Sequence, residues 1–223
     1  MKMVSMEFQK YNITDKIYLL VFEKQKDLGE TFVRFQEHYE SPEFAGRIFS
    51  LEEYKDWYIK NMPNAREKSR FTYYEDWNGF NIPSYVMRSF YEGRFNPLSE
   101  KEQKILDLFR NEEEPFYIIG TNKEVEDLEG YLRHETAHGL FYTDKKYRDK
   151  VLKIISEFDT SKMENELVEQ GYHTEVLKDE VHAYSIDYED SLKNCLTKEA
   201  REILREVYKE YLKKNNASFP EIK

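Results

Sequence analysis

A chain of 223 residues is long enough for one sizeable domain or for two small lobes that share a cleft. Its content of 39% hydrophobic and 16% aromatic residues is enough for a packed core, which argues against global disorder. The net charge is −10, and basic residues are interleaved with acids along the chain, so nucleic acid and anionic membrane are not expected partners. The single cysteine, Cys195, cannot form an internal disulfide, and the N-terminus lacks the apolar core of a signal peptide. We therefore expect a soluble, cytoplasmic protein.

The first predicted element is a strand. Residues Lys16 to Lys24 enclose a run of β-branched, aromatic and leucine residues flanked by charges, which is typical of a buried strand. The next segment, Asp27 to Tyr39, carries apolar residues at helical spacing but also alternates, so a helix and a strand both stay open. Ser50 then caps a short helix that ends near Pro63.

Less regular segments follow. Residues 61–69 predict a loop, and residues 71–74 predict a second strand. Residues 76–83 combine turn residues with large apolar ones, so they either contact a substrate or anchor the loop to the core through Trp77 and Phe80. We favour anchoring, because no side chain with evident chemistry lies there.

Two helices and a strand complete the first half. Ser84 caps a short helix to Tyr91, and Ser99 with Glu102 forms a capping box for the next helix. Residues 115–120, PFYIIG, predict a strand. Its first residue, a proline, suits the edge of a sheet, although the run fits an inner strand equally well.

The stretch from Thr121 to Tyr142 predicts the helix on which the function depends. Thr121 and Glu124 form a capping box that marks its start. On such a helix His134 and His138 lie one above the other on a single face, because they are four residues apart. Both imidazoles are then placed to bind one metal ion, and two satisfied core histidines are the alternative.

Glu135 lies about 100° round the helix from His134, too far to be a third ligand but well placed beside a metal-bound water. The run His134-Glu135-Thr136-Ala137-His138 resembles the HExxH signature of the zincin superfamily of metallopeptidases. The resemblance covers this helix and, more weakly, a later one. It implies Zn²⁺ as the cofactor, a peptide or protein as the substrate, and a small sheet lying over the active-site helix.

Further helices are marked by their ends. After a turn, one helix runs through Tyr147 to Ile155. Ser161 caps another, which Gly171 should end, and Thr197 opens the last helix of the chain.

Thr174 predicts the start of a helix that runs to about Tyr188, with Glu180 in the middle of its apolar face. A carboxylate buried without a partner is costly, and a cation held by His134 and His138 would be such a partner. A buried Arg, Lys or Tyr is the alternative. The gap of 42 residues from His138 to Glu180 is compatible with the glutamate-ligand branch of the zincins, so the resemblance implies Glu180 as the third ligand.

The same helix departs from the thermolysin-like pattern, in which an acid follows the ligand glutamate by four residues, because that position holds Tyr184. Asp179 or Asp187 are candidates to orient a histidine from behind. The helical projection places four polar residues either in solvent or beside Glu180 on the helix surface. They are Lys178, Asp179, His182 and Ser185.

Two further residues are candidates for the site. His173 is a rival ligand or an oxyanion donor, and Tyr184 is placed to polarise a substrate carbonyl. His38 is remote from every motif and is expected at the surface.

These features predict a predominantly helical α+β fold with a small antiparallel or mixed sheet over the HExxH helix. We expect a single zincin-like domain over residues 1–223. Residues 1–120 form its mixed α/β part, and residues 121–223 form a helical part that carries the metal site.

The predicted function is a zinc-dependent hydrolase, most simply a metallopeptidase. His134, His138 and Glu180 bind Zn²⁺, and Glu135 acts as the general base on a water. Substrate specificity and oligomeric state stay open.

Two other functions remain as alternatives. One is a non-catalytic zincin-like metal-binding protein that binds a partner. The other is a di-iron carboxylate protein, because Glu135-x-x-His138 matches its Glu-x-x-His half-motif and Asp179-x-x-His182 is a near copy of it.

Overall fold

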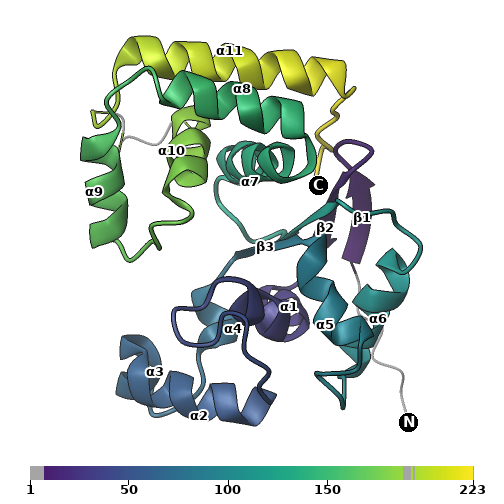
Figure 1. Cartoon of the computed structure of the whole chain (residues 1–223). Coiled ribbons are helices and arrows are strands. Elements are labelled where there is room, and N and C mark those ends of the chain that lie inside the picture. The colour runs from purple at the N-terminus through teal and green to yellow at the C-terminus, as the bar shows by residue number, and fades with distance from the viewer. Residues whose placement is uncertain (1–7, 188–191, 193, 223) are drawn as a thin grey trace. The chain divides into compact units, whose positions relative to one another are not determined.

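A computed structural model describes residues 8–187, 192 and 194–222 (Figure 1). The chain is predominantly helical α+β with a small four-stranded mixed sheet, which confirms the expected fold class at this level. It forms two compact units. Unit 1 comprises residues 1–11, 18–125 and 221–223, and unit 2 comprises residues 12–17 and 126–220.

Unit 1 contains the sheet and the helices of the first half of the chain. In chain order its elements are β1 (Phe8–Asn12), β2 (Ile17–Phe22), α1 (Gln25–Glu40), α2 (Leu51–Asn61), α3 (Pro63–Lys68), α4 (Tyr73–Asp76), β3 (Gly79–Pro83), η1 (Ser84–Met87), α5 (Arg88–Tyr91), α6 (Glu100–Phe109) and β4 (Tyr117–Asn122).

The four strands lie in the order β1-β2-β4-β3. β3 and β4 pair antiparallel, with Gly79 opposite Thr121 and Pro83 opposite Tyr117. Every residue of β2 and of β4 is buried, as expected for strands with a neighbour on both sides. Of the two positions left open for the PFYIIG run, the inner one is therefore correct.

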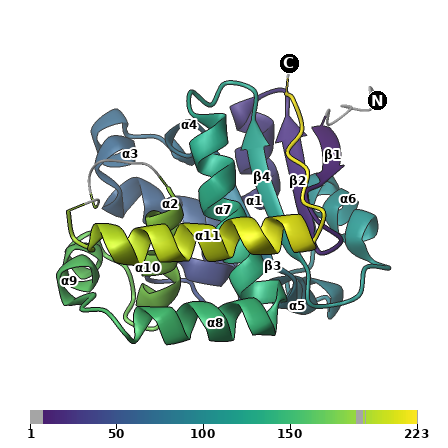
Figure 2. The same ribbon diagram turned by 90° about the horizontal axis from the view of Figure 1, so that it is seen from above.

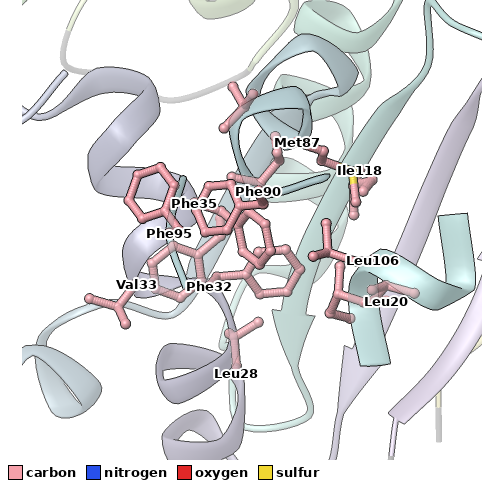
Figure 3. Packing of buried hydrophobic residues seen from close by; sticks show 14 of the residues in the cluster. Leu20, Leu28, Phe32, Val33, Phe35, Met87, Phe90, Phe95, Leu106 and Ile118 are labelled. Atoms are coloured by element: carbon pink, nitrogen blue, oxygen red, sulfur yellow. The ribbon is translucent and has the colours of Figure 1, made fainter. Parts of the chain in front are cut away.

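An aromatic core joins α1 to one face of this sheet (Figure 3). The ring of Phe32 stacks on that of Phe80 at 5.8 Å, and Phe90 stacks on Phe95 at 4.0 Å. Pairs of this kind add about 0.5–1.5 kcal/mol beyond the burial of their area. These contacts explain why residues 25–40 are a helix: its apolar spacing fits a continuous buried stripe against the sheet.

Two expectations for the middle of unit 1 are wrong. Residues 61–69 are not a loop, because Pro63 starts a short helix, α3, at the position where its missing N–H costs nothing. Residues 71–74 are not a strand. Tyr73 begins α4, and the aromatic side chains of this segment pack into a cluster with Tyr54 and Tyr58 instead of alternating across a sheet.

The second strand of this region is β3, within the segment 76–83 that was expected to be a loop. Phe80 is buried and anchors it, but Trp77 is 47% exposed and does not. The anchoring interpretation is therefore correct for one of its two aromatic residues.

Unit 2 is helical apart from the short segment 12–17. Its helices are α7 (Leu128–Thr143), α8 (Lys145–Ile155), α9 (Ser161–Glu169), α10 (Leu177–Ile186) and α11 (Lys198–Lys214). α10 packs against all four of the others, and α8 and α11 lie alongside each other (Figures 1 and 2). No helix in the described ranges combines the length and the apolar character that crossing a membrane requires.

The helix that carries the HExxH run begins later than predicted. Thr121 and Asn122 belong to β4, where Thr121 pairs with Gly79, so their backbone is extended. The N-cap of α7 is Asp127, whose carboxylate accepts a hydrogen bond from the N–H of Gly130 at 2.9 Å. The Thr121–Glu124 capping box is therefore wrong.

Other helix ends differ less. α9 is preceded by Thr160 at the N-cap, one residue before the expected Ser161, and Gly171 ends that region with φ of 99°, as predicted. α10 begins at Leu177 without a side-chain cap, so Thr174 does not cap it. The expected end of that helix at Tyr188 lies outside the described residues.

Candidate metal centre

Three side chains of unit 2 converge on one point. His134 and His138 extend from α7, and Glu180 extends from α10. The Nε2 atoms of the two histidines are 3.1 Å apart, and Glu180 Oε2 lies 3.9 Å from the first and 3.7 Å from the second. Their candidate ligand atoms all lie within 4.8 Å of one another. The three residues singled out from the sequence as ligands are thus brought together.

The local sequence explains this placement. Leu132, Thr136 and Leu140 are buried on the side of α7 away from the histidines and hold that helix in the core of unit 2. The four-residue spacing then stacks the two rings, with centroids 4.8 Å apart, on the other face. Since α7 and α10 pack together, this face meets Glu180.

A carboxylate supports one of the histidines from behind. Nδ1 of His138 lies 3.0 Å from Asp179 Oδ2. A hydrogen bond from that N–H to the carboxylate places the lone pair of the ring on Nε2, which is the atom that faces His134 and Glu180. Of the two acids considered for this role, Asp179 takes it.

The donor set fits a divalent cation. Glu180 Oε2 is buried and makes no hydrogen bond to any described residue, although an unpaired buried carboxylate oxygen is costly. It faces two imidazole nitrogens at distances close to the ~3.3 Å that tetrahedral zinc at 2.0–2.1 Å from each ligand would impose. Two nitrogens and one carboxylate oxygen are the ligands of many catalytic zinc sites.

The charges of the site point the same way. Burial raises the pKa of Glu180 to about 7, with Asp179 and Glu135 adding to the effect of burial and His138 opposing it. Burial and the neighbouring His138 lower the pKa of His134 to about 3. Burial alone would lower the pKa of His138, but Asp179, Glu180 and Glu135 together raise it well above its ordinary value. The carboxylates of Asp179, Glu180 and Glu135 thus act together on the place where a cation would bind.

Glu135 is buried on α7 beside the cluster. Its charge raises the pKa of both His138 and Glu180, so its carboxylate lies within electrostatic reach of the ligand group. It is not a member of that group, as its position on the helix predicts.

The expectation that Asp179, His182 and Ser185 point to solvent is wrong. His182 and Ser185 are fully buried, and Asp179 contacts His138. Projection of a single helix assigns one apolar face, but α10 is packed against α7, α8, α9 and α11, so its polar face is covered as well.

Of the other described residues considered from the sequence, only Tyr184 lies against the ligand cluster. His173 has a side chain 76% exposed and is not part of the cluster. The ring of Tyr184 packs edge-on against His134 at 4.8 Å, and its hydroxyl lies 2.9 Å from that of Tyr172. His38, in unit 1, is half-buried, with its ring nitrogens bonded to Arg47 O and Ser89 Oγ, so it is not a simple surface residue.

A separate cavity of 440 Å³ lies in unit 2 between the start of α7, the end of α10 and α11. Its walls are mainly apolar, with Leu132, Ile186 and Tyr208 among them, and it shares no residue with the ligand cluster. The cavity is therefore not part of the candidate metal centre.

Comparison with protein-family models, with curated proteins and with solved structures found no match to the chain. The functional assignment consequently depends on the HExxH pattern and on the geometry of the cluster.

Proposed function

We propose that the protein is a zinc-dependent hydrolase of zincin type that cleaves peptide bonds. The observation that carries the proposal is the convergence of His134 Nε2, His138 Nε2 and the hydrogen-bond-free Glu180 Oε2 beside the buried Glu135. A site built only for stability would need the ligands but not a second carboxylate next to them.

In this proposal His134, His138 and Glu180 hold the ion, and Asp179 holds His138 in the orientation that binding requires. The bound ion would polarise a carbonyl and lower the pKa of water in the fourth position towards about 7. Glu135 then accepts the proton of that water as it attacks, and delivers the proton to the leaving amine. Tyr184, beside His134, is a candidate to donate a hydrogen bond to the developing oxyanion.

The number of protein ligands supports a catalytic rather than a purely structural ion. The side chains of His134 and Glu180 are 16% and 12% exposed, while the ligand atom Glu180 Oε2 itself is buried. Structural zinc is closed off by a fourth protein ligand, whereas a catalytic ion keeps that position for water or substrate. The described residues contribute three ligands to the group, which leaves one position.

The di-iron alternative is less well supported. Asp179 lies at Nδ1 of His138, on the opposite edge of the ring from the nitrogen that faces His134 and Glu180. Within the described part of the chain only one group of three or more metal-binding side chains occurs, where a di-iron site needs two sets of ligands. Two irons per purified chain would reverse this preference.

A chelator test separates an enzyme from a non-catalytic metal-binding protein. We expect a broad peptide library to be cleaved by the zinc-loaded protein, the cleavage to stop after dialysis against a chelator, and Zn²⁺ to restore it. Mass spectrometry of the products measures this. Stoichiometric zinc without any cleaved peptide would favour the binding protein instead.

The affinity of the protein for Zn²⁺ should fall steeply as the pH is lowered. Glu180, with a pKa of about 7, and His138, with its raised pKa, must both lose their protons before they bind the ion. Below pH 7 we expect the affinity to fall by about tenfold or more for each pH unit. Competition with a zinc-binding dye between pH 5.5 and 8 measures the slope, and an affinity that is independent of pH would contradict the assignment of these ligands.

A further inference from the structure

A line of buried polar side chains runs away from the candidate metal centre. Starting from His138 on α7, it passes through Asp179 and His182 on α10 and ends at Tyr147 on α8. His138 Nδ1 lies 3.0 Å from Asp179 Oδ2, Asp179 Oδ1 lies 3.9 Å from His182 Nδ1, and His182 Nε2 lies 2.6 Å from the hydroxyl of Tyr147. Polar side chains thus connect three helices of unit 2, α7, α10 and α8, in a place where apolar side chains would be enough for packing.

The hydrogens along this line have one consistent arrangement. Asp179 Oδ1 and His182 Nδ1 are both buried and 3.9 Å apart, which is beyond hydrogen-bond distance, and neither atom makes a hydrogen bond to the described residues. The carboxylate can only accept, so Nδ1 of His182 carries the hydrogen. With the hydrogen on Nδ1, Nε2 of His182 accepts the hydroxyl hydrogen of Tyr147, whose oxygen is 2.6 Å away.

Asp179 consequently lies between two imidazoles, with Oδ2 at 3.0 Å from His138 Nδ1 and Oδ1 in a longer electrostatic contact with His182 Nδ1. Within the described residues no Lys or Arg forms an ion pair with it. Its direction therefore depends on His138 on one side and on His182 on the other, and Tyr147 determines which way the ring of His182 is turned.

We propose that Tyr147 and His182 are positioning residues for the metal centre: they orient Asp179, which keeps the hydrogen of His138 on Nδ1 and directs its Nε2 to the ion. This inference rests on the proposed zinc site. Direct hydrogen-bond partners of ligand histidines, as Asp179 is of His138, are typically worth 10–100-fold in metal affinity, and His182 and Tyr147 act through that partner.

Packing allows the hydroxyl of Tyr147 to be tested by itself. The ring of Tyr147 lies against that of Tyr211 at 4.9 Å and against His182 at 5.3 Å, so phenylalanine fills the same space. Tyr147→Phe leaves His182 Nε2 buried without its donor. The hydrogen bond that keeps the His182 ring turned with Nδ1 towards Asp179 is then lost. Tyr211→Phe removes a hydroxyl from the same cluster and is the matched control.

Substitutions at His182 separate donation from packing. In His182→Asn the amide nitrogen takes nearly the place of Nδ1 and still donates to Asp179, whereas His182→Leu removes the donor and keeps the volume. The measurements are Zn²⁺ affinity by competition with a chelating dye, the visible absorption of the Co²⁺-loaded protein, and circular dichroism as a check of folding.

We expect Tyr147→Phe and His182→Leu to lower Zn²⁺ affinity by about tenfold or more and to change the Co²⁺ spectrum. His182→Asn should retain more affinity than His182→Leu, and Tyr211→Phe should match the wild type in both measurements. If His182→Leu fails to fold, Tyr147→Phe decides the question.

Two results would overturn the proposal, and they differ. Unchanged affinity and spectrum in folded Tyr147→Phe and His182→Leu variants would show that the two residues are only structural, while the proposed enzyme stands. A wild-type protein that binds no Zn²⁺ would remove the site itself and the proposed function with it. Zinc binding without hydrolysis leaves the positioning role intact and rejects only the peptidase.

Discussion

Replacing Glu135 by glutamine should abolish hydrolysis while the protein keeps its zinc. Glutamine has nearly the same shape but cannot take a proton from the attacking water, so the general base is lost. Glu135 is outside the group of three ligands, so the ion should stay. We expect turnover to fall by about 100- to 10,000-fold, the range typical of a lost general acid–base group. Peptide cleavage and zinc content, measured on the same preparation, check both parts.

The control for this variant is Glu129→Gln on the same helix. Its side chain is 87% exposed and pairs only with Arg133 among the ion pairs of the described residues, so the change in charge is the same but its place is different. Activity and zinc content should both match the wild type. If Glu135→Gln loses its zinc together with its activity, Glu135 has a structural role in the site and the proposed mechanism is wrong.

Local geometry is the part of this site that can be predicted from sequence. Stacking of His134 on His138 needs only four residues of helix, and helical spacing is independent of the rest of the fold. Glu180 could be found because a carboxylate amid apolar neighbours requires a partner, and the structure places it 3.7 Å from His138. Neither argument needed a tertiary contact in advance.

The support behind the ligands could not be predicted in the same way. His182 is on the polar side of its own helix, and only the packing of α8 and α10 makes it a buried neighbour of Tyr147. Asp179 was considered as a support for a histidine, but sequence alone did not separate it from Asp187. The available sequence signal is that an Asp and a His, Asp179 and His182, lie on the polar face of the helix that carries the proposed ligand Glu180.

The wrong predictions of secondary structure also come from tertiary contacts. Residues 71–74 have strong strand propensity, yet an aromatic cluster with Tyr54 and Tyr58 determines their conformation. Thr121 and Glu124 have the spacing of a capping box, but pairing of Thr121 with Gly79 in the sheet prevents it from starting a helix. Tertiary contacts overrode a correct local preference in both places.

Substitution of Glu180 by glutamine should have opposite effects on the zinc-loaded and the zinc-free protein. With zinc, the loss of a charged ligand should lower affinity by more than about 100-fold, beyond the effect typical of an outer partner. Without zinc, the variant should be the more stable protein at neutral pH and above. The reason is that burial raises the pKa of Glu180 to about 7, so folding disfavours its ionised form.

The direction of the pH dependence follows from that shift. A carboxyl whose pKa is raised from 4.5 to about 7 on folding contributes nothing unfavourable well below pH 4.5. Its destabilising effect grows as the pH rises from 4.5 to about 7 and is constant above that. The zinc-free Glu180→Gln variant should therefore gain roughly 1–3 kcal/mol over the wild type at pH 8, and the difference should vanish near pH 4. Urea unfolding of both proteins at several pH values, with and without Zn²⁺, measures it.

The exposed Glu175, with a side chain 86% exposed, provides the control, because Glu175→Gln changes the same charge without removing a buried one. It should alter neither zinc affinity nor the pH dependence of unfolding. If Glu180 were instead the partner of a buried Arg or Lys, its replacement would destabilise the zinc-free protein at neutral pH, because the cation would be left unpaired. A zinc-free Glu180→Gln variant that is less stable than the wild type at pH 8 would thus reject the cation site, whereas a gain that reverses on addition of Zn²⁺ is expected only of a ligand.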